Sequence, residues 1–115
     1  MPKLHSLNRA VCEGFLGNVF EAHIPSLIAT RVERRGEDIA LIYHGTTVVR
    51  FTAEGVILNT GGFETATTKA RMNSALFGTP YIVASEKQVW YVFKNGLRYA
   101  PFEDGMLLVT SEAAQ

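Results

Sequence analysis

Cysteine is almost absent from this chain: Cys12 is the only one among its 115 residues. A single thiol cannot close an internal disulfide, so we expect a reducing compartment. Zinc sites need several cysteine or histidine ligands, and His5, His23 and His44 show no metal-ligand spacing. The sequence therefore predicts no metal and no cofactor, and a buried structural thiol at Cys12 rather than a nucleophile.

Long apolar runs and an excess of one charge are also missing. No run approaches the roughly 20 residues that cross a bilayer, and residues 1–10 lack the hydrophobic stretch of a secretory signal. Eleven basic residues balance eleven acidic ones, so the chain lacks the global positive field of typical nucleic-acid-binding proteins. We expect a cytoplasmic protein with no membrane partner.

The composition that is present describes one small globular domain. Hydrophobic residues make up 47% of the chain and charged residues 19%, which is an ordinary balance for a single domain of this length. Its core is modest, which favours a homo-oligomer. The few acidic residues lie mostly at predicted turns and form no obvious acid–base pair, so we expect no enzyme.

Short strands dominate the pattern from residue 29 onward. Asn95-Gly96 is the strongest hairpin signal, since both residues tolerate the positive φ angles of a tight turn. Runs of β-branched and aromatic residues between turn signals predict strands over 29–33, 39–44, 46–52, 56–60, 81–84, 88–94, 97–100 and 105–110.

One helix is predicted between the two groups of strands, over residues 65–77, with Thr65 or Glu64 as its cap and glycine and proline beyond its end. This order predicts an α+β fold, in which an antiparallel sheet of about five to seven strands carries the helix on one face. The predicted division is an N-terminal helix or arm over 1–28, a single domain over 29–110 and a frayed tail over 111–115. Within the arm, helical spacing covers 4–16 and a strand covers 18–23.

The strand-to-helix junction, residues 59–73, carries the candidate site. Two adjacent glycines and four threonines surround the start of the helix, where unpaired amides and the helix dipole favour an anion. Lys69 and Arg71 oppose that dipole. Either a bound phosphate or carboxylate, or the nearby Glu64, would relieve the conflict. The spacing matches neither a P-loop nor a dinucleotide fingerprint.

Two interpretations of this junction stay open. Lys69 and Asn73 fall on the helix side that faces the sheet, so they either engage the protein or line a cavity. Trp90 and Tyr91 point to opposite sides of a strand; either could cover a base, while core packing is the alternative for Trp90. The candidate ligand-binding set is Gly61, Gly62, Thr67, Thr68, Lys69, Arg71, Asn73, Trp90 and Tyr91.

Several stretches resemble a widespread family of small uncharacterised bacteriophage proteins. The shared pattern is an aliphatic strand, Asn-Thr-Gly-Gly-aromatic (59–63), Thr-Thr-Lys-x-Arg-Met-Asn (67–73), a Trp-Tyr strand (90–91) and acidic-Gly-Met (104–106). The resemblance covers about residues 40–109. It implies a viral origin and the host-cell cytoplasm, but no activity.

These observations lead to three hypotheses. The first is a non-enzymatic phage protein that binds an anionic small ligand, a nucleotide by preference. In size and style the chain resembles phage proteins that sequester nucleotide immune signals, such as the Thoeris anti-defence sponges, although no motif is shared. The second is an interaction module that contacts a host or phage protein. The third is weak nucleic-acid binding through Lys69, Arg71, Lys87, Lys94 and Arg98.

Overall fold

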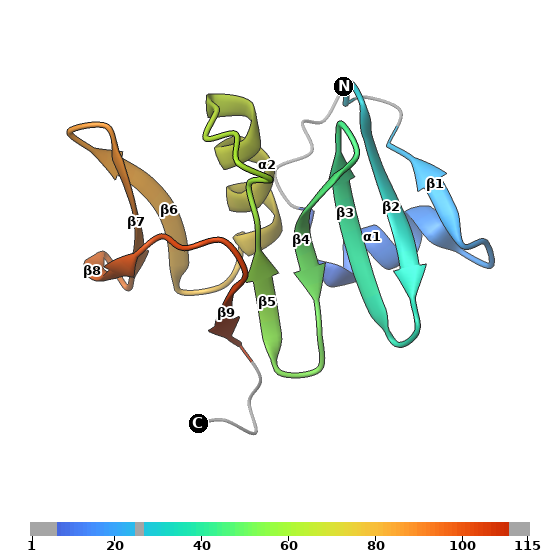
Figure 1. Cartoon of the computed structure of the whole chain (residues 1–115). Coiled ribbons are helices and arrows are strands. Elements are labelled where there is room, and N and C mark those ends of the chain that lie inside the picture. Colours follow the sequence, from blue (N-terminus) through green and yellow to red (C-terminus); the bar gives the residue numbers. More distant parts are fainter. Residues whose placement is uncertain (1–6, 25–26, 111–115) are drawn as a thin grey trace, which may run out of the picture.

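The computed structural model describes residues 7–24 and 27–110 (Figure 1). The described chain contains two helices and nine strands. In chain order they are α1 (Arg9–Leu16), β1 (Glu21–His23), β2 (Thr30–Arg35), β3 (Asp38–Tyr43), β4 (Thr46–Phe51), β5 (Gly55–Leu58), α2 (Ala66–Leu76), β6 (Tyr81–Glu86), β7 (Val89–Lys94), β8 (Leu97–Pro101) and β9 (Met106–Val109).

The strands form two antiparallel sheets, one with the order β1-β2-β3-β4-β5-β9 and one with the order β6-β7-β8. The predicted α+β class, with an antiparallel sheet and a helix packed on it, is confirmed. The strands that follow α2 do not all join the first sheet, however. β6, β7 and β8 pair through local turns on the other side of the helix, and only β9 returns to pair with β5 (Figure 1). Strand propensity predicts where strands occur but not which distant strand they join.

Helix α1 and strand β1 are part of the shared core. Asn8 caps α1 by accepting a hydrogen bond from the Val11 amide at 3.0 Å, and Cys12 and Leu16 on the helix are buried. Strand β1 extends the large sheet by pairing with β2. The predicted boundary at residue 28 stays a prediction, but the described residues before it pack with the rest, and the predicted tail over 111–115 lies outside the described residues.

Helix α2 lies between the two sheets (Figure 1). Thr65 caps it by accepting a hydrogen bond from the Thr68 amide at 3.1 Å, so the predicted cap is confirmed. Met72, Ala75 and Leu76 are almost fully buried and belong to one apolar cluster. The same cluster includes Leu41 of the large sheet and Val83 of the small one. The helix therefore supplies the apolar surface on which both sheets pack.

The face of the large sheet that lies away from this cluster is charged and internally neutralised. The strand register places Glu33 opposite Ala40 and Arg31 opposite Ile42. Arg31 contacts Glu33 at 3.0 Å, and similar ion pairs join Arg31 to Glu21, Arg35 to Glu33 and Arg50 to Asp38. Burial alone would raise the pKa of Glu33, but the hydrogen bonds from its arginine neighbours outweigh that effect and lower the pKa.

Gly55 permits the close approach of β9 to β5, and we predict that Gly55→Ala destabilises the protein by about 3 kcal/mol. A methyl group at Gly55 would collide with the backbone carbonyl of Leu108 and lie 2.9 Å from the Thr110 nitrogen. Urea unfolding followed by circular dichroism measures the change. Gly14→Ala is the matched control, because a methyl group at Gly14 meets nothing within 4 Å. This substitution removes a glycine from the middle of α1 and should stabilise the protein by about 0.5–1 kcal/mol. Equal stability of the Gly55→Ala variant and the wild type would contradict this prediction.

Candidate functional site

The two glycines of the junction are held by side chains of the residues just before them. Asn59 Oδ1 accepts from the Gly61 amide at 2.8 Å, and Thr60 Oγ1 accepts from the Gly62 amide at 3.0 Å. Both glycines have positive φ angles, 65° and 90°. A methyl group at Gly61 would lie 2.7 Å from Thr46 Oγ1, so this turn packs closely on the β3–β4 turn. The glycine amides predicted as ligand donors are therefore already engaged.

A carboxylate from the far end of the chain fixes the same junction. Asp104 accepts hydrogen bonds from the Thr60 amide at 2.7 Å and from Thr60 Oγ1 at 2.9 Å. The next residue, Gly105, donates its amide to the Leu58 carbonyl at 2.7 Å. In the sequence, the acidic-Gly-Met stretch (104–106) is recognisable only as part of a resemblance. The structure shows that this stretch holds the Asn-Thr-Gly-Gly turn.

Lys69, Asn73 and Trp90 lie together on the side of α2 that faces the small sheet. Asn73 is bonded twice to the backbone of Val83, donating to its carbonyl at 2.8 Å and accepting from its amide at 2.7 Å. Lys69 Nζ donates to Ser85 Oγ at 3.2 Å and lies 5.6 Å from the centre of the Trp90 ring. Trp90 is 7% exposed. Of the two open interpretations, these contacts match engagement within the protein.

Arg71 and Tyr91 lie elsewhere. Arg71 Nε donates to Thr30 Oγ1 at 3.1 Å, and its guanidinium carbon is 5.5 Å from the centre of the Tyr43 ring, on the large-sheet side. Tyr91 lies on the small sheet, where the guanidinium carbon of Arg98 is 4.2 Å from the centre of the Tyr91 ring. Ligand binding by the predicted set stays a prediction, but the geometry divides these residues among separate surfaces. The reason is local: positions 69 and 71 of a helix point about 200° apart.

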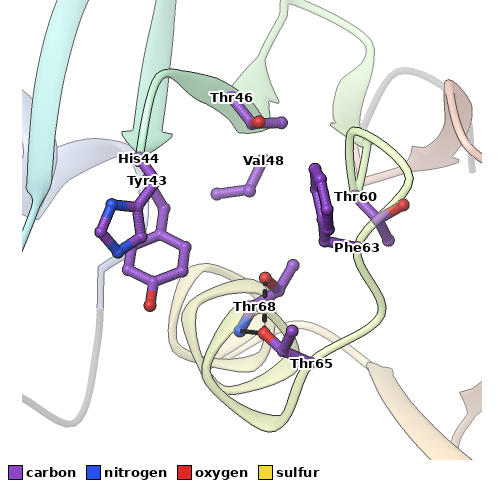
Figure 2. A pocket seen from close by; sticks show the side chains of 8 residues that line it. All are labelled: Tyr43, His44, Thr46, Val48, Thr60, Phe63, Thr65 and Thr68. Carbon is purple, nitrogen blue, oxygen red and sulfur yellow. Dashed lines mark hydrogen bonds between the residues drawn. The ribbon is translucent and has the colours of Figure 1, made fainter.

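A cavity of about 310 Å³ opens at the junction, on the large-sheet side of α2 (Figure 2). This volume is near the lower limit of known ligand pockets. Only Thr68 of the predicted set lines it; Gly61, Gly62, Thr67, Lys69, Arg71, Asn73, Trp90 and Tyr91 do not. The lining residues are Tyr43, His44, Thr46, Val48, Thr60, Phe63, Thr65 and Thr68.

Aromatic rings enter the cavity from two sides (Figure 2). The Tyr43 and His44 rings are 4.4 Å apart and inclined at 59°. Phe63, on the loop between β5 and α2, faces them across the cavity (Figure 2) and is 68% exposed. Val48, which is fully buried, lies between the two sides. The pairing of β3 with β4 shifts beside Val48, and such a bulge turns a side chain out of the regular alternation.

Threonine hydroxyls supply the polar part of the lining. Thr65 Oγ1 donates to Thr68 Oγ1 at 3.0 Å and accepts from the Thr68 amide (Figure 2). Thr68 is 3% exposed, and its oxygen accepts that bond. A threonine hydroxyl can also donate its own proton to an acceptor. The Ala66 and Thr67 amides, in the first turn of α2, make no hydrogen bond with the described residues. The cavity thus combines ring faces with threonine hydroxyl groups, and the two unpaired amides belong to neighbouring residues that do not line it.

Sequence reasoning missed most of this cavity because its walls come from two turns that are distant in the sequence. His44 has a positive φ of 49° and lies in the tight β3–β4 turn, across the cavity from Phe63 (Figure 2). Two features of the sequence lie at these turns. A histidine followed by glycine ends a buried strand, and an aromatic residue follows two glycines. Neither signal predicts that the two turns face each other.

Other chemistry is sparse in the part of the chain that the structure describes. Residues 7–24 and 27–110 contain no group of three or more histidine, cysteine, aspartate or glutamate side chains that could hold a metal ion. Within the same ranges, no helix has the length and apolarity to cross a membrane. Cys12 is fully buried, and its thiol donates to the Leu7 carbonyl at 3.4 Å.

These features define a small α+β protein with a lined cavity where its central helix begins. Residues 18–109 match the family model of the Kyanoviridae Gp96 protein. The chain therefore belongs to this bacteriophage protein family. This agrees with the phage resemblance in the sequence and extends the matched region from about residue 40 back to residue 18. A search of curated proteins and a search of solved structures each gave no match.

Asn73 anchors the small sheet to α2, and we predict that Asn73→Ala costs about 2–3 kcal/mol, because it leaves a buried amide and a buried carbonyl of Val83 unpaired. The free energy of unfolding in urea measures the loss, with Trp90 fluorescence as the probe. Ser74→Ala is the control, since the neighbouring Ser74 side chain makes no hydrogen bond with the described residues. If both variants were equally stable, the anchoring role would be disproved.

Burial raises the pKa of the Cys12 thiol from 9.0 to about 12. The folded state therefore holds the proton more tightly than the unfolded state. This contribution to stability is complete below pH 9 and is lost as the pH rises toward 12. We predict that in this window the wild type loses about 1.4 kcal/mol per pH unit relative to Cys12→Ala. Urea unfolding of both proteins across the window tests it, and parallel pH dependences would contradict it.

Proposed function

We propose that this phage protein binds a nucleotide-sized ligand in the junction cavity, without turnover. The observation that carries the proposal is the opposition of Phe63 to the Tyr43–His44 pair across a cavity of about 310 Å³ (Figure 2). Flat heterocycles stack on such rings, and each stacked base contributes about 1–3 kcal/mol of binding free energy. A cavity near the lower limit of ligand pockets fits one base and its sugar, not a longer oligonucleotide.

The polar lining supports the same class of ligand. The Thr68 hydroxyl proton is available for an acceptor on the edge of a base or sugar, and the Thr46 hydroxyl lies on the opposite wall (Figure 2). A phosphate would lie at the mouth of the cavity, near the unpaired amides of Ala66 and Thr67, where the helix dipole favours an anion. Lys69, which the sequence analysis assigned to phosphate, is not needed in this arrangement.

Nucleic-acid binding has less support. Lys69 and Arg71 contact the protein on opposite sides of α2, Lys94 lies between Tyr81 and Tyr99, and Arg98 pairs with Glu86. Such dispersed cations do not form the continuous basic groove that tracks a nucleic-acid backbone. A binder of single nucleotides in the host cytoplasm would act by depletion or sensing, as in the sequestration of a nucleotide immune signal.

The test uses a panel of nucleosides, the corresponding monophosphates and inorganic phosphate. We predict that at least one nucleoside or nucleotide raises the melting temperature and that inorganic phosphate alone does not. For that ligand, Phe63→Ala should weaken the affinity measured by calorimetry about tenfold, because it removes one stacking face.

Phe77→Ala is the matched control for Phe63→Ala. Phe77 is also an exposed phenylalanine beside α2, at 58% exposure, but it does not line the cavity. The affinity of this variant should equal that of the wild type. A panel without any thermal shift, or equal affinities for Phe63→Ala and the wild type, would overturn the proposal.

A further inference from the structure

The small sheet has one covered face and one open face. Val83 and Val92 point toward α2 and are almost fully buried. By the strand register, residues of the opposite parity lie on the other face, and Ile82 and Val89 among them are exposed. The register aligns Ile82 with Phe93, and Tyr91 with both Ala84 and Pro101. These residues, with Val89, form what we call the outer face.

The outer face is mostly apolar, whereas a sheet face in contact with water usually carries polar residues. Ile82 and Val89 are 51% and 50% exposed. The open face of the large sheet, by contrast, is polar, with arginine side chains paired to glutamate and aspartate carboxylates over its strands. A contiguous apolar face on a small protein marks an interaction surface. The residue types on the outer face also suit an interface. Tyrosine and arginine are enriched in binding hot spots, and on this face Arg98 stacks on Tyr91.

The charges of this face favour a second copy of the chain as its partner. Within β6, β7 and β8, only Glu86 and Arg98 place charged side chains on it, and they contact each other at 2.6 Å. One carboxylate and one guanidinium make the face neutral and self-complementary. A two-fold interface needs a self-complementary surface, because the same face of each copy contacts the same face of the other. A nucleic acid would require an excess of positive charge, which the outer face lacks.

We propose that the outer face of β6-β7-β8 is a two-fold dimer interface between two copies of this chain. The apolar residues Ile82, Tyr91 and Phe93 form its centre. Arg98 of each copy pairs with Glu86 of the other across the axis, in place of the pair within one chain. This interface is separate from the junction cavity, which opens on the other side of α2, so it does not depend on the ligand proposal.

Sedimentation velocity of the full chain over a concentration series tests the interface. The wild type should dimerise, and Ile82→Glu should weaken dimerisation at least about tenfold, because it places a charge at the apolar centre. Leu107→Glu is the matched control: Leu107 is a strand residue of similar exposure, 43%, in β9 of the other sheet. It should leave dimerisation unchanged. Circular dichroism confirms that each variant is folded.

A charge exchange distinguishes this interface from any other. The Arg98→Glu chain carries two carboxylates on the outer face, and the Glu86→Arg chain carries two guanidinium groups, so each chain alone should be monomeric. Mixed together, they should form a one-to-one heterodimer. Three outcomes would each overturn the proposal: a monomeric wild type, equal effects of Ile82→Glu and Leu107→Glu, or a mixture that stays monomeric. If a different protein covers this face, the wild type will be monomeric, and the proposal is overturned in the same way.

Discussion

The packing of two sheets on opposite sides of one short helix is the constraint on which the rest of this structure depends. Helix α2 is too polar to be a free-standing core element, and its buried side is limited to a few residues such as Met72 and Leu76. Polar contacts complete the packing, with Asn73 bonded to the backbone of β6 on one side and Arg71 bonded to Thr30 on the other. Side chains that suggested a ligand site in the sequence therefore hold the layers together.

Local features of the fold could be predicted from the sequence, because each depends on neighbouring residues. Thr65 caps α2, and Asn95 and Gly96 form the β7–β8 turn with positive φ angles. Long-range pairing could not be predicted. The return of β9 to β5 and the bond from Thr60 to Asp104 join segments about half a chain apart, and no periodicity within either segment encodes them. The cavity was missed for the same reason, since the turns that hold His44 and Phe63 meet only in three dimensions.

The side of α2 on which a residue falls decides its role. Residues 69 and 73 are one turn apart and both reach the small sheet, whereas Thr65 and Thr68 line the cavity against the large sheet. Lys69 and Asn73 lie on a side of the helix that faces a sheet, as the helical spacing predicts. That side is occupied by a second sheet, which the sequence does not predict. The cavity on the large-sheet side is therefore lined by hydroxyl and aromatic groups instead of cations.

The contact between Asp104 and Thr60 has a consequence for folding kinetics. It spans 44 residues, and contacts of such sequence separation form late because the entropy of closing the intervening chain must be overcome first. The hairpins β2-β3-β4 and β6-β7-β8 can assemble by short-range collapse, while the turn beside Phe63 acquires its final shape only when the C-terminal strand docks. During synthesis on the ribosome, the cavity would be among the last parts of the molecule to mature, after both sheets already exist in outline.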